Sequence, residues 1–233
     1  MKTFEDKLKN SAYPGRGIVI GMTPDGENVV HVYWIMGRSV NSRNRIFEMD
    51  GEFMRTKAFD EAKLTDPSLV IYYPVKNAGG FHIVTNGDQT DTIYEYLAND
   101  STFEEALNTR CYEPDPPNFT PRISGISDMD SMSYKLSILK TVDNNETLEQ
   151  KCFFSYANYM NGTGHCITTY IDDGNPLPSF EGEPYKVALF NDIDATIENF
   201  WSYLDKDNRV SIAVKFINVE TGEAVVRIIN KNV

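Results

Sequence analysis

The sequence predicts an α+β fold in a single domain that spans residues 1–233, with mostly antiparallel strands and few helices. Two features of the 233-residue chain favour this class: short β-branched and aromatic segments alternate with turn residues, and few segments have a helical pattern. A third feature is the lack of any Ser/Gly-rich or other composition break that would mark a domain boundary. A chain of this length is sufficient for one large core.

Two hairpins are predicted in the first quarter of the chain. Residues 17–21 (GIVIG) and residues 28–36 (NVVHVYWIM) are apolar segments on either side of the turn sequence Thr-Pro-Asp-Gly at 23–26. A second pair of strands, residues 45–49 and 53–58, flanks an Asp-Gly turn. Hairpin strands pair antiparallel, so both segments favour antiparallel sheets.

The middle of the chain contains two further predicted strands and two helices. Residues 68–75 (SLVIYYPV) are expected to form a strand that ends at Pro74, and residues 81–85 (FHIVT) another. Helices are expected at residues 91–98 and 102–108, the second with a threonine N-cap and early glutamates. A stiff, proline-rich loop follows.

The second half repeats the pattern of strands and Asn- or Gly-containing turns. One amphipathic helix is expected at residues 194–204. The expected strands lie at residues 132–142, 151–158, 164–170, 185–190, 210–218 and 224–229.

Composition narrows the classes of partner. The net charge of −12 and the pI of about 4.7 disfavour nucleic-acid polymers and anionic membrane surfaces, because an acidic surface repels phosphates. No apolar segment approaches a membrane span and the polar N-terminus has no secretory signal, so a cytoplasmic protein is expected. The three cysteines and three histidines lack metal-ligand spacing, which predicts no metal site and no disulfide framework.

Three polar segments carry the candidate chemistry. Residues 37–45 (GRSVNSRNR) concentrate arginines, serines and asparagines, which suit a phosphate or carboxylate, although a solvated loop has the same composition. Residues 85–92 (TNGDQTDT) join a strand to a helix, where Asp88 or Thr90 can cap the helix and free N–H groups can hold an anion; an ordinary capped turn is the alternative.

The third segment, residues 113–125 (EPDPPNFTPRISG), is a rigid loop with two carboxylates and an arginine. The alternative is a structural crossover in which Glu113 or Asp115 pairs with Arg122. Tyr72 and Tyr73 lie at the end of a predicted strand, so one of them can present its phenol to a pocket. Nucleotide-binding and hydrolase motifs such as GxxxxGK[ST] and GxSxG are missing from the sequence. Residue types alone therefore predict a polar pocket for a small anion.

Five motifs in order, YPGRGIVIG, GRS…NR, TNGDQTD, YEPDPPNFTPRISG and PSFEGEP, resemble the archaeal-type IMP cyclohydrolase family over most of the chain. The resemblance implies a four-layer αββα sandwich like the N-terminal nucleophile hydrolase fold, with the site between two mostly antiparallel sheets. It implies no N-terminal nucleophile, no cofactor and no metal. The implied reaction closes 5-formamidoimidazole-4-carboxamide ribotide to inosine monophosphate with loss of water, a step of purine biosynthesis.

The resemblance also implies roles for individual residues. Arg38, Tyr72 and Glu113 are the expected catalytic residues, with Tyr72 preferred over Tyr73 for proton transfer. Arginines are expected to neutralise the 5′-phosphate and the developing oxyanion, and amides, carboxylates and hydroxyls to hold the ribose and the base. The expected substrate-binding residues are Arg16, Ser39, Arg43, Asn44, Arg45, Asn86, Gly87, Asp88, Thr90, Asp115, Asn118 and Arg122.

The expected partner is a small purine nucleotide, with no nucleic-acid polymer and no membrane, and the sequence is compatible with a homo-oligomer. Asp88 and Gln89 stand where the resemblance leads us to expect a small residue and a histidine. This difference motivates a second hypothesis, a purine-nucleotide-binding protein without catalysis. A third hypothesis is an amide hydrolase on the same scaffold.

Overall fold

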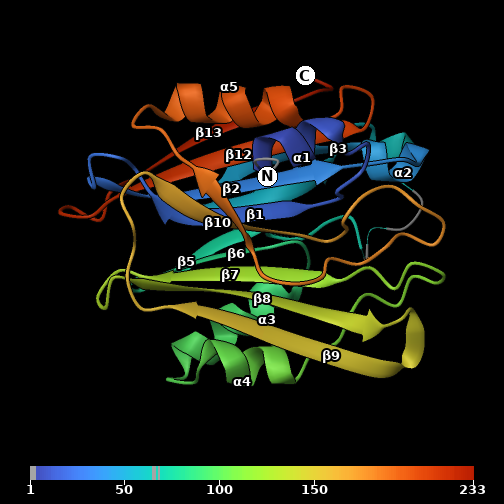
Figure 1. Cartoon of the computed structure of the whole chain (residues 1–233), viewed down its shortest axis with the longest axis horizontal. Coiled ribbons are helices and arrows are strands. Elements are labelled where there is room, and N and C mark those ends of the chain that lie inside the picture. The colour runs from blue at the N-terminus through green and yellow to red at the C-terminus, as the bar shows by residue number, and fades with distance from the viewer. Residues whose placement is uncertain (1–3, 65–66, 68) are drawn as a thin grey trace.

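The computed structural model describes residues 4–64, 67 and 69–233, and it is an α+β structure with two antiparallel sheets. One sheet has the strand order β11-β10-β1-β2-β12-β13 and the other the order β3-β4-β5-β6-β7-β8-β9. Figure 1 shows the two sheets stacked face to face, with α1 and α5 outside the first sheet and α3 and α4 outside the second.

The first sheet and its helices are built from elements at the two ends of the chain. They are α1 (Phe4–Asn10), β1 (Gly17–Met22), β2 (Asn28–Met36), β10 (Thr163–Thr168), β11 (Tyr185–Ala188), α5 (Ile193–Tyr203), β12 (Arg209–Asn218) and β13 (Ala224–Asn230).

The second sheet and its helices come from the middle of the chain. They are α2 (Val40–Arg43), β3 (Arg45–Asp50), β4 (Phe53–Ala58), the 3-10 helix η1 (Glu61–Lys63), β5 (Val75–Ala78), β6 (Phe81–Thr85), α3 (Gln89–Ala98), α4 (Phe103–Asn108), β7 (Arg122–Asp128), β8 (Ser133–Val142) and β9 (Asn145–Tyr156).

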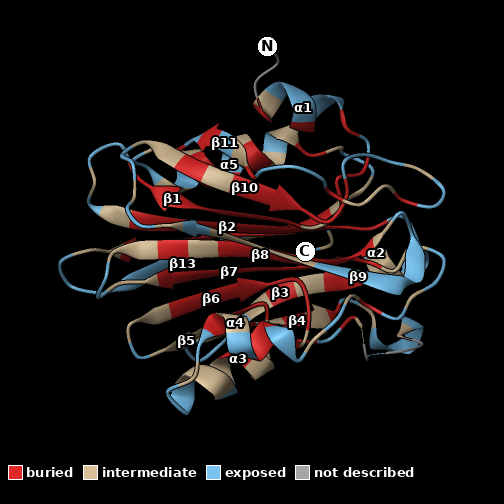
Figure 2. Cartoon of the chain, turned by 60° about the horizontal axis from the view of Figure 1, so that its bottom comes forward, coloured by how far each residue is buried: buried red, intermediate tan, exposed pale blue. Residues whose placement is uncertain are grey.

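Side-chain alternation on β2 explains the layering. Tyr33 and Ile35 face the second sheet, whereas Val32 and Trp34 face the helices outside the first. Trp34 stacks on Phe200 of α5. Facing strands of both sheets are buried, as the red ribbons in Figure 2 show. Apolar burial between layers is the main stabilising contribution to such a sandwich.

The first residue of β1, Gly17, packs so closely against Trp34 that only glycine fits there. A Cβ atom at this position would lie 1.9 Å from the Trp34 ring. The predicted glycine-bounded strand is confirmed, and the pairing of Gly17 with Trp34 gives the reason for its first glycine.

The predicted hairpins β1–β2 and β3–β4 are confirmed, and the strands expected at residues 210–218 and 224–229 pair antiparallel as β12 and β13. The expected strand at residues 68–75 is wrong where the structure describes it: residues 69–74 form no strand, β5 begins only at Val75, and Ser68 lies outside the described residues. Here the side chain of Thr56 on β4 makes hydrogen bonds that a neighbouring strand's backbone would otherwise make. Its Oγ1 accepts from Tyr72 N at 2.9 Å and donates to Val70 O at 2.7 Å, while Pro74 offers no N–H.

Strand β7 was not expected, and Arg122 is its first residue rather than part of a loop. The β7 sequence RISGISD has small residues where strands usually carry bulky ones, so its pattern is weak. Gly125 of β7 leaves room for Ile20 of the facing sheet, whose Cδ1 would lie 2.7 Å from an added Cβ. Helix α1 was also not expected from its charged sequence.

Candidate active site

Several strand ends meet at the end of the sandwich where α2 lies (Figure 1). β1 begins there and β2 ends there, because Gly17 pairs with Trp34. In the second sheet, β6 ends beside the start of β7, because Thr85 pairs with Ser124. The strands and the loops at this end contribute six polar residues that we call the Arg16–Glu113 cluster: Arg16, Tyr33, Arg45, Tyr72, Glu113 and Arg122.

Glu113 is a buried carboxyl surrounded by arginines. It is 2% exposed, and its backbone N–H donates to Thr120 O at 2.9 Å. Burial raises the pKa of Glu113 to about 6, while the charges of Arg16 and Arg122 oppose the rise. A carboxyl with a pKa near neutrality is suited to both accept and return a proton.

Arg16, just before β1, is the second member of the cluster. Burial lowers its pKa, but the charge of Glu113 raises it, and the net shift is upward, so the guanidinium stays charged. Its Nε is buried and has no hydrogen-bond partner among the described residues. An unsatisfied charged donor in the interior is costly, so this atom points to an anionic ligand.

Arg45, the first residue of β3, has the same property. It is 1% exposed; its Nε donates to Ser42 O at 2.9 Å and its Nη2 to Met36 O at 3.4 Å. Its Nη1 lacks a partner in the part of the chain that the structure describes. Burial lowers its pKa, and the charge of Arg16 lowers it further. Two neighbouring buried guanidinium groups are stabilised by an anion between or beside them.

Two tyrosines join the sheets at this cluster. The hydroxyls of Tyr33 on β2 and Tyr72 before β5 are 2.8 Å apart, and both side chains are buried. Burial raises the pKa of Tyr33 well above its usual value. Tyr73 instead points outward and donates to Asp50 at 2.6 Å. The structure thus places Tyr72, not Tyr73, at the cluster.

Arg122 is held by the loop that follows β6. Its Nη1 donates to Asp88 at 2.6 Å and to Gln89 Oε1 at 2.7 Å, instead of pairing with Asp115. Asp88 also accepts from Arg110 Nη2 at 2.5 Å. Burial raises the pKa of Asp88, but the two arginines outweigh it and the net shift is downward. Asp88 occupies the N-cap position of α3, but its side chain makes no cap hydrogen bond, so the expected capping role is wrong.

Gly87 lies against the carboxylate and the guanidinium at once. A Cβ atom here would be 2.6 Å from Arg122 Nη1 and 3.5 Å from Glu113 Oε1. The close approach of the backbone therefore needs glycine at this position. Thr90 does not cap α3 by its side chain either; its hydroxyl donates to Gly87 O at 3.1 Å and lies 2.6 Å from Thr85 Oγ1.

Asn86 and Gln89 are buried, they are hydrogen-bonded to each other, and Gln89 also accepts from Arg122. Asn86 Oδ1 accepts from Ile123 N at 2.8 Å and from Gln89 Nε2 at 3.0 Å, and its Nδ2 donates to Pro121 O at 2.9 Å. Both groups of the Asn86 amide are therefore engaged in bonds to α3, to Pro121 and to the start of β7.

Asp115 and Asn118 hold the proline-rich loop. Asp115 accepts from the Thr120 N–H at 2.6 Å and hydroxyl at 2.5 Å, and Asn118 Oδ1 accepts from Leu177 N at 3.2 Å. The Thr120 hydroxyl lies 2.7 Å from Tyr170 OH. These bonds fix the segment that carries Glu113.

The loop of residues 37–45 contributes Arg45 to the cluster but directs its other polar residues elsewhere. Arg38 Nη1 donates to Asp173 at 2.5 Å, and its guanidinium lies over the Tyr13 ring at 5.0 Å, on the surface. Ser39 caps α2. Arg43 donates to Gly37 O at 2.9 Å and to the Asn208 side chain.

Asn44 binds the backbone of Asp60 through both of its amide groups, at 2.8 Å each. The structure thus brings together Arg16, Arg45, Tyr72, Glu113 and Arg122. Sequence reasoning missed Tyr33, because its neighbours on β2, from Val32 to Met36, are apolar. It also missed Gln89 and Arg110 as the partners of Arg122 and Asp88.

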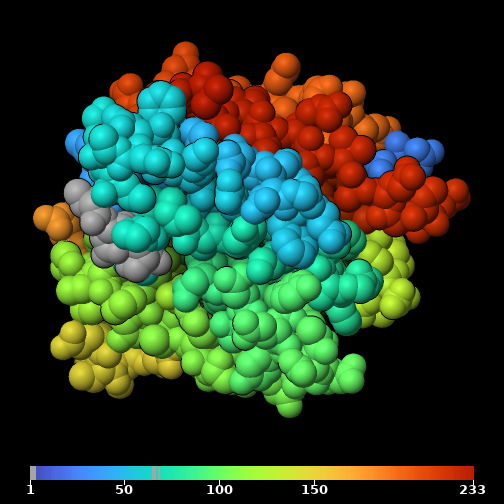
Figure 3. All heavy atoms as spheres, turned by 180° about the vertical axis from the view of Figure 1, so that it is seen from behind, coloured from blue at the N-terminus to red at the C-terminus, as the bar shows by residue number. Residues whose placement is uncertain are grey.

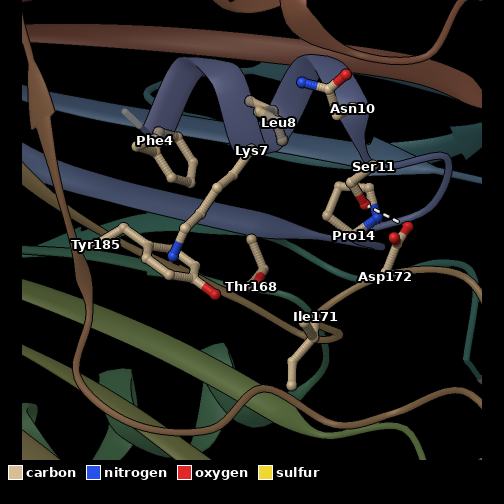
Figure 4. Close-up of a pocket in the computed structure, with 10 residues that line it drawn as sticks. All are labelled: Phe4, Lys7, Leu8, Asn10, Ser11, Pro14, Thr168, Ile171, Asp172 and Tyr185. Atoms are coloured by element: carbon tan, nitrogen blue, oxygen red, sulfur yellow. Dashed lines mark hydrogen bonds between the residues drawn. The ribbon is translucent and has the colours of Figure 1, made fainter. Parts of the chain in front are cut away.

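A separate cavity of about 350 Å³ lies beside α1. Figure 4 shows Lys7 above the Tyr185 ring and the hydrogen bond from Ser11 to Asp172, 2.8 Å long. This cavity is lined by none of the six residues of the Arg16–Glu113 cluster. The described residues also contain no group of three metal-ligating side chains, and no helix with the length and apolar character of a bilayer crossing.

The sequence matches the model of a protein family over most of the chain. The family is described as IMP cyclohydrolase-like protein, and the match covers residues 13–222. The chain belongs to the IMP cyclohydrolase-like family. All six residues of the Arg16–Glu113 cluster fall inside the matched region.

Individual members of the IMP cyclohydrolase-like family are similar over part of the chain. The IMP cyclohydrolase of Halobacterium salinarum is 32% identical over 127 residues, which are 52% of this chain and 60% of that protein. The IMP cyclohydrolase of Methanopyrus kandleri is 32% identical over 120 residues, or 50% of this chain and 59% of its own length. The matched part thus spans about three fifths of the length of either relative.

Proposed function

We propose that the protein is an IMP cyclohydrolase that closes 5-formamidoimidazole-4-carboxamide ribotide to inosine monophosphate and water. The observation that carries the proposal is a buried carboxyl with a pKa near 6, placed among arginines whose donors lack partners among the described residues, inside the family match. The archaeal relatives named for this activity support it. We further propose a single domain with an arrangement like that of the N-terminal nucleophile hydrolases.

Ring closure requires a weak nucleophile, the carboxamide nitrogen, to attack the formyl carbon. We assign two proton transfers to Glu113. As the N–C bond forms, the carboxylate takes a proton from the attacking carboxamide nitrogen and gives it to the formyl oxygen, which becomes a hydroxyl. It then takes the N–H proton of the former formamido nitrogen and gives it to that hydroxyl, which leaves as water while the C=N bond of the ring forms. The reaction then balances, because substrate minus one water is the product. The raised pKa of Glu113 makes both transfers accessible near neutral pH.

The arginines supply the charge that the substrate and its transition state need. We assign the free Nε of Arg16 to the developing formyl oxyanion and the free Nη1 of Arg45 to the phosphate side of the nucleotide. Arg122, fixed by Asp88 and Gln89, orients the substrate beside Glu113. Tyr72 donates its phenol proton as a hydrogen bond, with Tyr33 as its support.

The unexpected pair Asp88 and Gln89 fits this scheme. Both side chains bind Arg122, so they position a site residue and need not contact the substrate themselves. Catalysis is therefore favoured over a binding-only role. We propose that the remaining expected residues, Arg38 among them, act at the rim or in holding the loops.

The test is a turnover assay with the formamido ribotide, following the absorbance of inosine monophosphate. Wild-type protein should exceed the spontaneous rate, and Arg45→Met should lose at least tenfold in kcat/KM because a charge-assisted contact is removed. Arg55, a half-buried arginine of β4 that pairs with Glu48 and lies outside the cluster, is the matched control, and Arg55→Met should retain activity. Folded wild-type protein without turnover would refute the proposal, and calorimetric binding in that case would favour a nucleotide-binding protein.

A further inference from the structure

A second polar group lies between the sheets, on the facing strands β2 and β12. Lys215 of β12 pairs in register with His31 of β2, and both face the second sheet. Lys215 Nζ lies 2.8 Å from His82 Nδ1 of β6, and His31 Nε2 lies 2.6 Å from Ser127 Oγ of β7. None of these residues belongs to the Arg16–Glu113 cluster.

Lys215 is unusual because it is 5% exposed and has no carboxylate within ion-pair distance among the described residues. Buried lysines are normally paired. An ammonium has three donors, and the described residues provide one hydrogen-bond partner, His82. The Nδ1 of His31 is likewise buried without a partner in the described chain.

Lys215 and His82 line a cavity of about 430 Å³ at the sheet edge. Its other walls include Met49 of β3, Glu52 of the β3–β4 turn, Asn77 of β5 and Val226 of β13. Figure 3 shows these segments together on the back of the molecule: residues near 50 in light blue, near 80 in green, and near 225 in red. A volume of this size accommodates a small molecule.

The surroundings favour the neutral amine. Burial lowers the pKa of Lys215 to about 8, with the charge of Glu52 opposing the change. Burial and the charge of Lys215 lower the pKa of His82 to about 4, so His82 is a neutral acceptor near neutral pH. Burial, with the charges of His82 and Lys215, also keeps the pKa of His31 well below its usual value. These groups and Glu52 are the titratable neighbours that the amine faces.

We infer that Lys215 is a nucleophilic amine in a second binding site, which takes small aldehydes or ketones as imines. The Nζ lone pair attacks the carbonyl carbon, and one N–H proton moves to the former carbonyl oxygen to give a carbinolamine. Loss of a second N–H proton and of hydroxide, together one water, leaves the C=N bond. A lysine buried away from water at the wall of a cavity is the usual setting for this chemistry. The inference goes beyond the ring closure and does not depend on it.

The test uses butyraldehyde and cyanoborohydride on the full chain, with peptide mass spectrometry to follow each lysine. Near pH 7.5, Lys215 should be alkylated at least about tenfold faster than Lys63, whose side chain is 63% exposed. The reason is that burial lowers the pKa of the Lys215 amine to about 8, and the neutral amine is the nucleophile. The Lys215 rate should rise with a midpoint near pH 8. Equal rates at the two lysines would overturn the inference.

Two neighbouring substitutions on β13 separate cavity binding from general reactivity. Ala224 lines the cavity, whereas Val225 does not line it and is 48% exposed. Ala224→Trp should slow alkylation of Lys215 at least fivefold by filling the cavity, and Val225→Trp should leave it unchanged. If both variants react like wild type, Lys215 does not act through this cavity and the second site is refuted.

Discussion

The buried carboxyl of Glu113 makes a direct prediction about stability. The rise in its pKa from 4.5 to about 6 corresponds to about 2 kcal/mol of preference for the protonated form in the folded state. Because the folded-state pKa lies above the unfolded value, this stabilisation is present below pH 4.5 and is lost as pH rises through about 6. A glutamine at position 113 has no such dependence.

The free energy of unfolding of Glu113→Gln, relative to wild type, should therefore rise by about 2 kcal/mol between pH values near 4 and near 8. Taking the difference between the two proteins cancels the titration of all other groups, and the pH-independent cost of the substitution drops out. Urea denaturation followed by circular dichroism over this range measures it.

Glu105 provides a control of opposite sign. Hydrogen bonds from the Thr102 backbone and hydroxyl lower the pKa of this capping-box carboxyl. Glu105→Gln should therefore lose stability relative to wild type as pH rises through the titration of that carboxyl. A pH-independent difference for Glu113→Gln, or one with the sign of Glu105→Gln, would show that Glu113 is not the desolvated acid described above.

Three further results are expected in the ring-closure assay. The wild-type kcat/KM should rise with pH and level off above about pH 6. Glu113→Gln should lack this rise with pH and lose on the order of 100-fold in kcat. A wild-type profile that is flat from pH 5 to 8 would contradict the proton-transfer role of Glu113. Tyr72→Phe should lower kcat by about tenfold with little change in KM, while Tyr73→Phe, which alters a surface phenol, should match wild type; equal effects of the two would remove Tyr72 from the site. Gly87→Ala should raise KM at least about tenfold, because the added methyl group displaces the Arg122 side chain, while the circular dichroism spectrum stays unchanged. Wild-type kinetics for this variant would show that the observed position of the Arg122 side chain is not required for substrate binding.

Elements with local signals were predictable. The hairpin β1–β2 has its turn sequence and two apolar strands in one stretch of the chain, and α4 begins with a capping box at Thr102. β7 was not predictable, because its strand character comes from lying between β6 and β8 rather than from its own serines and glycine. The segment around Tyr72 is the opposite case. Its residues favour a strand, but its backbone bonds to the side-chain hydroxyl of Thr56 and residues 69–74 form no strand.

The candidate site divides along the same line. Arginines, a tyrosine pair and a rigid acidic loop were visible in the sequence, and they were sufficient to indicate a small anionic ligand within an acidic protein. Which arginines are buried was not visible: Arg43 and Arg45 are two residues apart, yet one binds surface groups and the other is enclosed. Tyr33 was indistinguishable from its apolar neighbours on β2.

The physical reason is that residue type sets the chemistry a group can perform, whereas its environment comes from packing. Glu113 is an ordinary carboxyl until the two sheets enclose it and until Arg16, about a hundred residues away in the chain, lies beside it. Desolvation and opposite charge then decide its pKa, and both arise only from contacts between distant segments. The acidic composition disfavours phosphate polymers, and the tertiary structure decided where the buried positive charge of Arg16 and Arg45 lies.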